Sequence, residues 1–253
     1  MTGKITDSRP APVVTVDGPG GVGKGTVSQI IAGRLGWHYL DSGALYRVVG
    51  LAASDRGIEL ANGAAIANLA GRVRMDFEPR ADGEPARVFL DGKDVSDRIR
   101  TEDAGRLASV VAAIPEVRTV LLGVQRGFRA PPGLVTDGRD MGTTVFPDAT
   151  LKIFLTASPE IRAERRYKQL KEKGLHANLS ALQGEIRDRD LRDSTRATSP
   201  LVPAADAEVL DTSSMSIDEV VVHITKRLNE RLGIAVPGGS GSGMSGSGSP
   251  DSM

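Results

Sequence analysis

The chain has 253 residues, of which 40% are hydrophobic and 25% charged, so it is long enough and apolar enough to bury one substantial core. Its formal net charge is zero, which gives no long-range attraction to nucleic acid or to an anionic membrane. The absence of cysteine excludes disulfide bonds, cysteine-ligated zinc, iron–sulfur clusters and thiol catalysis. Since no apolar leader and no run of about 18 apolar residues is present, we expect a cytoplasmic protein that spans no membrane.

The first structured element follows residues 1–12, which we expect to be flexible. Val13–Asp17 is an apolar run typical of a buried strand, and the next nine residues, GPGGVGKGT, precede an amphipathic stretch. This is the context of a phosphate-binding P-loop, in which glycines let backbone N–H groups turn toward a phosphate and Lys24 reaches the β- and γ-phosphate oxygens. Gly25 stands where the usual pattern has Ser or Thr, so the predicted magnesium contact moves to Thr26. The residues expected to bind the triphosphate are Gly18, Pro19, Gly20, Gly21, Val22, Gly23, Lys24, Gly25 and Thr26.

Four further short apolar runs alternate with helical patterns along the chain. This alternation predicts an α/β fold with a parallel sheet and helices on both faces. Ser158-Pro159 and the pair Ser216 and Glu219 are helix-start signals, the second being a capping box. The four predicted strands are His38–Asp41, Leu134–Asp137, Leu151–Thr156 and Val209–Thr212.

Polar side chains follow two of these strands, at the sheet edge where such folds bind ligands. Ser42 and Arg47 come after the second strand and predict a site for an acceptor phosphate. Arg139 lies between Asp137 and Asp140 in a loop with two glycines after the third strand. Asp137 ends a hydrophobic strand as a Walker-B acid does, so it is a candidate for holding hydrated magnesium; the alternative is a turn-stabilising Asx residue.

Two segments depart from the alternation. Residues 72–97 contain two strand patterns and an Asp-Gly turn, which predict a small antiparallel insert. Residues 159–196 are polar, charged and mostly helical; they predict either a lid that hinges over a ligand or a solvated helical hairpin. On a helix, Arg189, Asp193 and Arg196 share one face and could clasp a phosphorylated sugar, the alternative being a surface ladder of ion pairs.

The remaining features favour neither a metal site nor further structure. Residues 237–253 are rich in glycine and serine and are predicted to be a disordered tail. His38, His176 and His223 are not spaced as metal ligands and are expected to be packing or surface residues.

Six blocks in this order resemble the bacterial cytidylate kinase family, a group of P-loop nucleoside monophosphate kinases, over about Val13 to Gly233. Lys-Gly-Thr in the P-loop is also what kinases of this group have. The blocks are GPGGVGKGT, LDSGALYR, VQRGFR, VTDGRDMGTTVFP, RDRDLRDSTRATSPL and PAADAEVLDTS.

The resemblance implies one kinase domain at 13–236: a five-stranded parallel core (13–71, 98–158 and 197–236), a monophosphate-binding insert (72–97) and a lid (159–196). It also implies roles for individual residues. The acceptor phosphate would be held by Arg47, Arg139 and Arg196, with Ser42 nearby. Cytosine would be bound by Ser109, Arg126 and Asp140, and the sugar hydroxyl by Arg189 and Asp193. ATP would be covered by Arg162 or Arg166.

The implied reaction is direct, in-line transfer of a phosphoryl group from magnesium-bound ATP to CMP or dCMP by a monomeric enzyme, with Lys24 following the migrating group. Small molecules would be its only partners, with no nucleic acid and no membrane. Three other functions stay open. The first is another small P-loop kinase with adenylate, shikimate or gluconate as acceptor, and the second is a GTP-dependent switch, although no Asn-Lys-x-Asp motif is present. The third is a nonenzymatic module that binds phosphate or nucleic acid.

Overall fold

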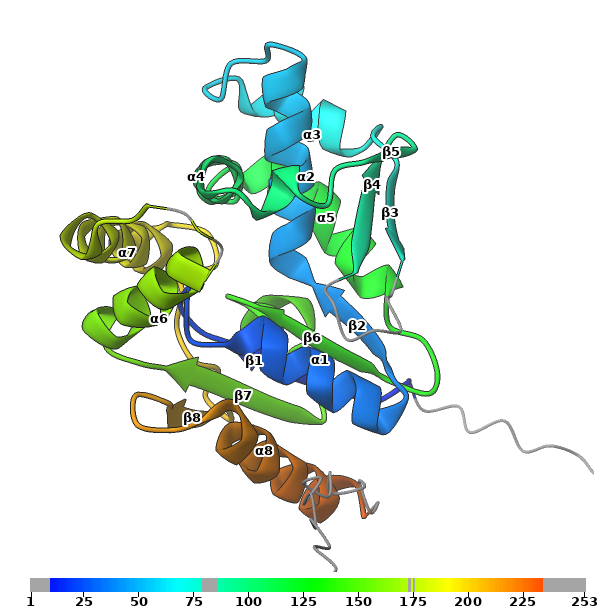
Figure 1. Ribbon diagram of the computed structural model, residues 1–253. Coiled ribbons are helices and arrows are strands. Elements are labelled where there is room, and N and C mark those ends of the chain that lie inside the picture. Colours follow the sequence, from blue (N-terminus) through cyan, green and yellow to red (C-terminus); the bar gives the residue numbers. More distant parts are fainter. Residues whose placement is uncertain (1–9, 79–85, 173, 175, 234–253) are drawn as a thin grey trace, which may run out of the picture.

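The computed structural model describes residues 10–78, 86–172, 174 and 176–233. Five parallel strands form a central sheet in the order β2-β6-β1-β7-β8 (Figure 1). The predicted α/β fold class is therefore confirmed, with β6 one residue longer than predicted and β8 shifted by one residue. The strands are β1 (Val13–Asp17), β2 (His38–Asp41), β6 (Leu134–Gly138), β7 (Leu151–Thr156) and β8 (Glu208–Asp211).

Strand β1 lies at the centre of the sheet, and every one of its residues is buried. Val13 packs into the apolar layer on one face, while Val14 and Val16 pack into the layer on the other. This two-sided burial is the reason that β1 is a continuous apolar run rather than an alternating pattern.

Helices cover both faces of the sheet, as the alternation of strand and helix patterns predicts. Helices α1 (Lys24–Leu35) and α8 (Ile217–Leu232) pack on the face of Val14, and α2 (Ser42–Asp55) and α5 (Pro115–Gly127) on the face of Val13. The capping box at the start of α8 is formed, since the Ser216 side chain accepts from Glu219 N and the Glu219 carboxylate from Ser216 N.

The predicted antiparallel insert is present as the sheet β3-β4-β5. Its strands are β3 (Met75–Glu78), β4 (Arg87–Leu90) and β5 (Lys93–Asp94). Asp91 and Gly92 join β4 to β5 with φ values of 49° and 79°, the left-handed pair that suits an Asp-Gly hairpin turn. Helices α3 (Gly63–Ala70) and α4 (Glu102–Val111) flank this part of the chain, with a 3₁₀ turn, η1 (Arg98–Arg100), before α4.

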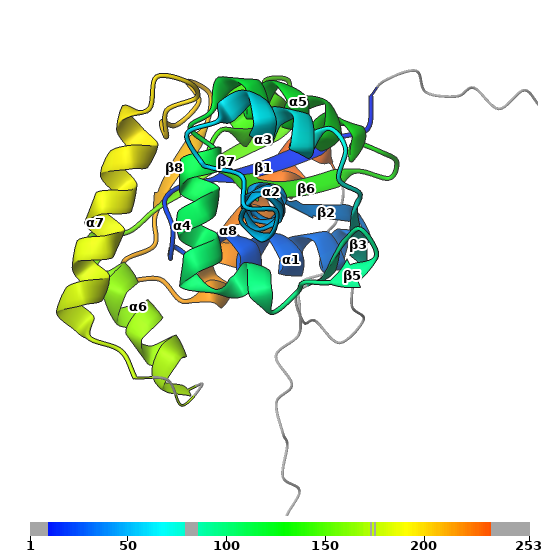
Figure 2. The ribbon, with the colours of Figure 1, turned by 90° about the horizontal axis from the view of Figure 1, so that it is seen from above.

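The charged segment after β7 forms two helices, α6 (Pro159–Glu172) and α7 (Leu179–Thr195). They pack against each other beside the sheet, and α7 lies next to α4 in both views (Figures 1 and 2). The Ser158 hydroxyl caps α6 by accepting from Ile161 N, and Asn178 caps α7. Helix α7 ends at Thr195, so the prediction that Arg196 continues its helical face is wrong: Arg196 has the extended ψ of 139°.

Most of the predicted flexible segment 1–12 and all of the predicted tail 237–253 lie outside the described residues. Within the described ranges, no single helix is long and apolar enough to cross a membrane. Of the helices in the described part of the chain, α4 and α5 taken together meet that length and composition, and they meet at an angle of 104°.

Candidate active site

The P-loop connects the carboxyl end of β1 to α1, and its shape depends on glycine. Gly18, Gly21 and Gly23 have φ values of 143°, 82° and 88°, which other residues rarely adopt. A Cβ atom on Gly18 would stand 2.0 Å from the Leu155 carbonyl oxygen, so only glycine fits there. The Lys24 side chain is buried, and its Nζ donates to the Pro19 carbonyl at 2.7 Å within the same loop.

Charged groups around Lys24 oppose one another in a buried environment. Burial and the nearby Arg139 guanidinium lower the pKa of Lys24, whereas burial and the Asp41 carboxylate raise the pKa of Asp137. The Tyr39 hydroxyl donates to Asp137 Oδ1 at 2.6 Å. Perturbed ionisable groups of opposite sign at a strand edge are typical of a site that binds a charged ligand.

Arg139 lies next to the P-loop and contacts helix α7. Its Nε donates to Asp193 Oδ2 of α7 at 2.8 Å, and the Asp193 side chain is only 6% exposed. Arg189 Nε lies 4.0 Å from the same carboxylate oxygen. Gly20 of the P-loop faces both guanidinium groups, since a Cβ atom there would stand 3.6 Å from each. Arg139, Arg189 and Asp193 therefore lie together next to the P-loop, and their binding of one ligand stays a prediction.

Two buried donors of the arginine cluster have no acceptor among the described residues. Burial lowers the pKa of Arg189 to about 10, with contributions from the Arg139 and Arg47 guanidiniums. Arg189 Nε and Arg196 Nη2 are buried and have no hydrogen-bond partner, while Arg196 Nε donates to the Ser199 carbonyl at 2.5 Å. Buried N–H groups are normally paired, so these two donors are available to an anionic ligand.

Asp140 has a partner that the sequence did not predict. Arg118 Nη2 of α5 donates to Asp140 Oδ2, and the two side chains are 8% and 3% exposed. The Arg118 guanidinium also lies 5.6 Å from the centre of the Tyr46 ring. The Ser109 hydroxyl of α4, which precedes Arg118 in the sequence, is buried and has no hydrogen-bond partner. The available signal for Arg118 was a charged side chain between Val117 and the apolar residues Val120, Leu121 and Leu122.

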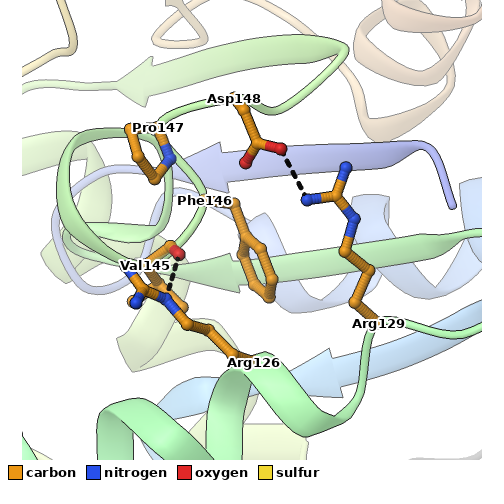
Figure 3. A pocket seen from close by; sticks show the side chains of 6 residues that line it. All are labelled: Arg126, Arg129, Val145, Phe146, Pro147 and Asp148. Carbon is orange, nitrogen blue, oxygen red and sulfur yellow. Dashed lines mark hydrogen bonds and ion pairs between the residues drawn. The ribbon is translucent and has the colours of Figure 1, made fainter. Parts of the chain in front are cut away.

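Arg126, predicted to contact the base, lies elsewhere in the structure (Figure 3). Its Nε and Nη2 donate to the Val145 and Thr144 carbonyls at 3.0 and 3.2 Å. The side chain lines a surface pocket of about 210 Å³ with Arg129, Val145, Phe146, Pro147 and Asp148. Arg129 in turn donates to the Ala11 carbonyl at 2.6 Å, just before β1, so this pocket lies at the edge of the sheet opposite the P-loop. Arg118, not Arg126, is therefore the arginine next to Asp140.

The two lid arginines predicted to contact ATP differ in position. Arg162 is 2% exposed, donates to the Gly20 carbonyl at 3.1 Å and forms an ion pair with Asp190. Arg166 is more exposed and forms an ion pair with Glu102 at the start of α4. Arg162 therefore contacts the P-loop, while Arg166 connects α6 to α4.

The other predicted residues lie along the same edge. The Ser42 hydroxyl is buried and donates to the Asp137 carbonyl at 2.8 Å, and Arg47 Nη1 donates to the Ile99 carbonyl at 2.9 Å. Thr26 is exposed in the first turn of α1. Among the described residues, no three or more His, Asp or Glu side chains are grouped to hold a metal ion. Thr26 and Asp137 nevertheless fit magnesium, because this ion is typically held by one or two protein oxygens together with water and phosphate.

Comparison with known proteins identifies the family of this chain. The family described as "Cytidylate kinase" matches residues 14–230. Cytidylate kinases from Aeromonas hydrophila and Stutzerimonas stutzeri are 54% and 53% identical over 223 residues, covering 88% of this chain and 96% and 97% of theirs. The cytidylate kinase of Nitrosococcus oceani is 57% identical over 213 residues, covering 84% of this chain and 94% of its own. With a P-loop, a buried arginine cluster and near-complete alignment to these relatives, this chain belongs to the cytidylate kinase family.

Proposed function

We propose that this chain transfers the γ-phosphoryl group of ATP to CMP or dCMP, giving CDP or dCDP and ADP. The observation that carries the proposal is the set of unpaired, buried donors on Arg189 and Arg196. Arg139, beside them, reaches both the P-loop and Asp193. A phosphate of the acceptor, placed beside Arg139 and Arg196, would satisfy the Arg196 donor and would face a phosphate held by the P-loop, while a sugar hydroxyl would accept from Arg189.

The donor nucleotide would bind along residues 18–26, where the loop N–H groups and Lys24 meet the phosphates. A phosphate oxygen is a stronger acceptor than the Pro19 carbonyl that Lys24 contacts in this structure. Thr26 and Asp137 would hold a hydrated magnesium ion, which neutralises charge on the β- and γ-phosphates. Arg162, already at the Gly20 carbonyl, would close this side of the site.

In the reaction, an oxygen of the CMP phosphate attacks the γ-phosphorus while the bond to the β,γ-bridging oxygen breaks, and ADP leaves with that oxygen. The acceptor oxygen is already anionic near neutral pH, so the enzyme needs no strong general base. Its task is to bring two anions together and to stabilise the charge spread over the transferred group. Arg47, Arg139 and Arg196 would do this, with Ser42 nearby, and Arg189 and Asp193 would hold the sugar hydroxyl.

For the base, we propose that Asp140 accepts a hydrogen bond from the cytosine N4 amine, and that Arg118 and Ser109 donate to its O2 and N3 atoms. Arg118 replaces Arg126 in this proposal because it is the arginine paired with Asp140. Uracil has an acceptor at the corresponding position, which would face the Asp140 carboxylate without a proton between them. The site should therefore discriminate against UMP.

A coupled assay of ADP release tests the proposal. Purified protein with ATP and magnesium is offered CMP, dCMP, UMP, AMP, shikimate and gluconate in turn. We expect turnover with CMP and dCMP, and a kcat/KM for UMP at least about 10-fold lower, since an unpaired buried group costs about 1–3 kcal/mol. No CDP from CMP with folded protein would contradict the proposal. Preference for AMP, shikimate or gluconate would assign the acceptor pocket to another kind of P-loop kinase, and binding without turnover would favour a nucleotide switch.

A further inference from the structure

Asp17 is a buried carboxylate that the mechanism above does not use. It is the last residue of β1, directly before the P-loop, and is 5% exposed. Its Oδ1 accepts from Met141 N at 2.9 Å and its Oδ2 accepts from Gly142 N at 2.8 Å. Both acceptor oxygens of one side chain are therefore bound to successive backbone groups of the segment that directly follows Arg139 and Asp140.

This segment, the single π-helical turn η2 (Met141–Val145), is held closely against β1 at that point. A Cβ atom on Gly142 would stand 2.9 Å from Thr15 Oγ1 and 3.4 Å from Asp17 Oδ2, so the backbone approaches the strand more closely than a larger residue would allow. Beyond the turn, Lys152 Nζ donates to the Pro147 carbonyl at 2.6 Å. Asp17 thus anchors the start of the segment, next to the site, and Lys152 binds the chain two residues beyond its end.

The charged groups that face Asp17 belong both to the P-loop and to the loop that follows β6. Lys24 of the P-loop stabilises its ionised form, and the Asp140 carboxylate opposes it. Asp17 is therefore close both to Lys24, which would serve the donor nucleotide, and to Asp140, which would serve the base. A shift of the turn by a fraction of an ångström would move Arg139 and Asp140 relative to the P-loop.

We propose that Asp17 is a positioning residue for phosphoryl transfer: by binding the N–H groups of Met141 and Gly142, it sets Arg139 and Asp140 at a fixed distance from the P-loop. The inference rests on the proposed function, and it deepens that function by identifying how the donor and acceptor sites are kept at a fixed distance from each other. Asp17 itself touches neither substrate in this scheme.

The test compares Asp17→Asn with Thr15→Val. Asparagine keeps the shape of aspartate but offers one carbonyl oxygen, so one N–H group of the turn is left facing an NH₂ group. Thr15 precedes Asp17 by two residues, faces the same glycine, and has a buried hydroxyl without a partner, so valine removes no hydrogen bond. Both variants change a buried polar group of β1, but only Asp17→Asn breaks the anchor.

For each variant, kcat and KM are measured separately for ATP, CMP and UMP, together with the melting temperature. For Asp17→Asn, we expect kcat/KM with CMP to fall by about 10- to 100-fold, which corresponds to one lost hydrogen bond to a charged group. The CMP-to-UMP preference should fall as well, while KM for ATP should stay within about threefold because the loop N–H groups are intact. Thr15→Val should keep all kinetic constants within about threefold.

An Asp17→Asn protein that melts at a lower temperature but keeps normal CMP kinetics and selectivity would overturn the inference, since its role would then be structural only. So would equal losses in the two variants. Amide exchange on the wild-type protein covers the case in which Asp17→Asn does not fold: the Met141 and Gly142 amides should exchange as slowly as those of β1, and unprotected exchange there would refute the anchor. Failure of the proposed function is distinguishable, because the wild-type protein itself would then produce no CDP.

Discussion

Asp140→Asn removes one negative charge from a buried pair and leaves Arg118 with a neutral partner. The two side chains are 8% and 3% exposed, so water cannot replace the lost charge. Removing one partner of such a pair typically costs about 3–5 kcal/mol. Because asparagine keeps the shape and one acceptor oxygen, we expect a smaller loss than this, about 2–3 kcal/mol of unfolding free energy. In a chain of this size, that corresponds to a fall of roughly 4–12 °C in melting temperature.

The same substitution changes what the site offers to a base. Asparagine can turn its NH₂ group toward the uracil O4 atom, which the Asp140 carboxylate would repel. We expect the ratio of kcat/KM for CMP to that for UMP to fall by about 10- to 100-fold, equivalent to about 1.5–3 kcal/mol. The coupled assay with each acceptor at saturating ATP measures this ratio, and a thermal melt measures the stability change on the same sample.

Two arginine variants provide the control. Arg118→Ala should lower the CMP-to-UMP ratio as Asp140→Asn does, whereas Arg126→Ala should leave it within about threefold, because Arg126 donates to the Val145 and Thr144 carbonyls away from Asp140. Unchanged selectivity in a folded Asp140→Asn protein would remove Asp140 from base recognition. If the CMP-to-UMP ratio changes in Arg126→Ala and not in Arg118→Ala, the arginine that contacts the base is Arg126, as predicted from the sequence.

Three further outcomes are expected. Lys24→Ala should lower kcat by about 100-fold or more while the melting temperature changes little, since the lysine acts on phosphate; near-normal turnover would show that it has no such role. Arg139→Ala should raise KM for CMP and lower kcat, because one guanidinium would contact both the bound and the transferring phosphate, and a change in stability alone would make it structural. Stability should also depend on pH through Asp17. Burial raises the pKa of Asp17 from 3.8 to about 6. Between these pH values the folded protein therefore binds more protons than the unfolded chain. Acidification from pH 7 to pH 4 should stabilise the wild-type protein relative to Asp17→Asn by up to about 3 kcal/mol. Chemical denaturation of both proteins across this range measures the difference, and a constant difference would contradict the raised pKa.

Local sequence signals were sufficient for most of the fold. The buried strand β1, the glycines of the P-loop and the capping box of α8 each follow from a few neighbouring residues, because backbone conformation and hydrogen bonding at these points are local. The Asp91-Gly92 turn is of the same kind. Helix α7 shows the limit of periodicity: the pattern of charges continued to Arg196, but the helix ends one residue earlier.

The candidate site likewise has residues that the sequence predicted and contacts that only the tertiary structure shows. The sequence by itself determined the P-loop and placed Asp137, Arg139 and Asp140 at the ligand edge, because residues that end parallel strands meet at one edge whatever the loops do. Only the tertiary structure decided which arginine lies beside Asp140, since Arg118 and Arg126 stand on the same helix and differ in the side that faces the site. The anchoring of Met141 and Gly142 by Asp17 joins groups more than 120 residues apart, and such a contact depends on how the whole sheet brings distant segments together.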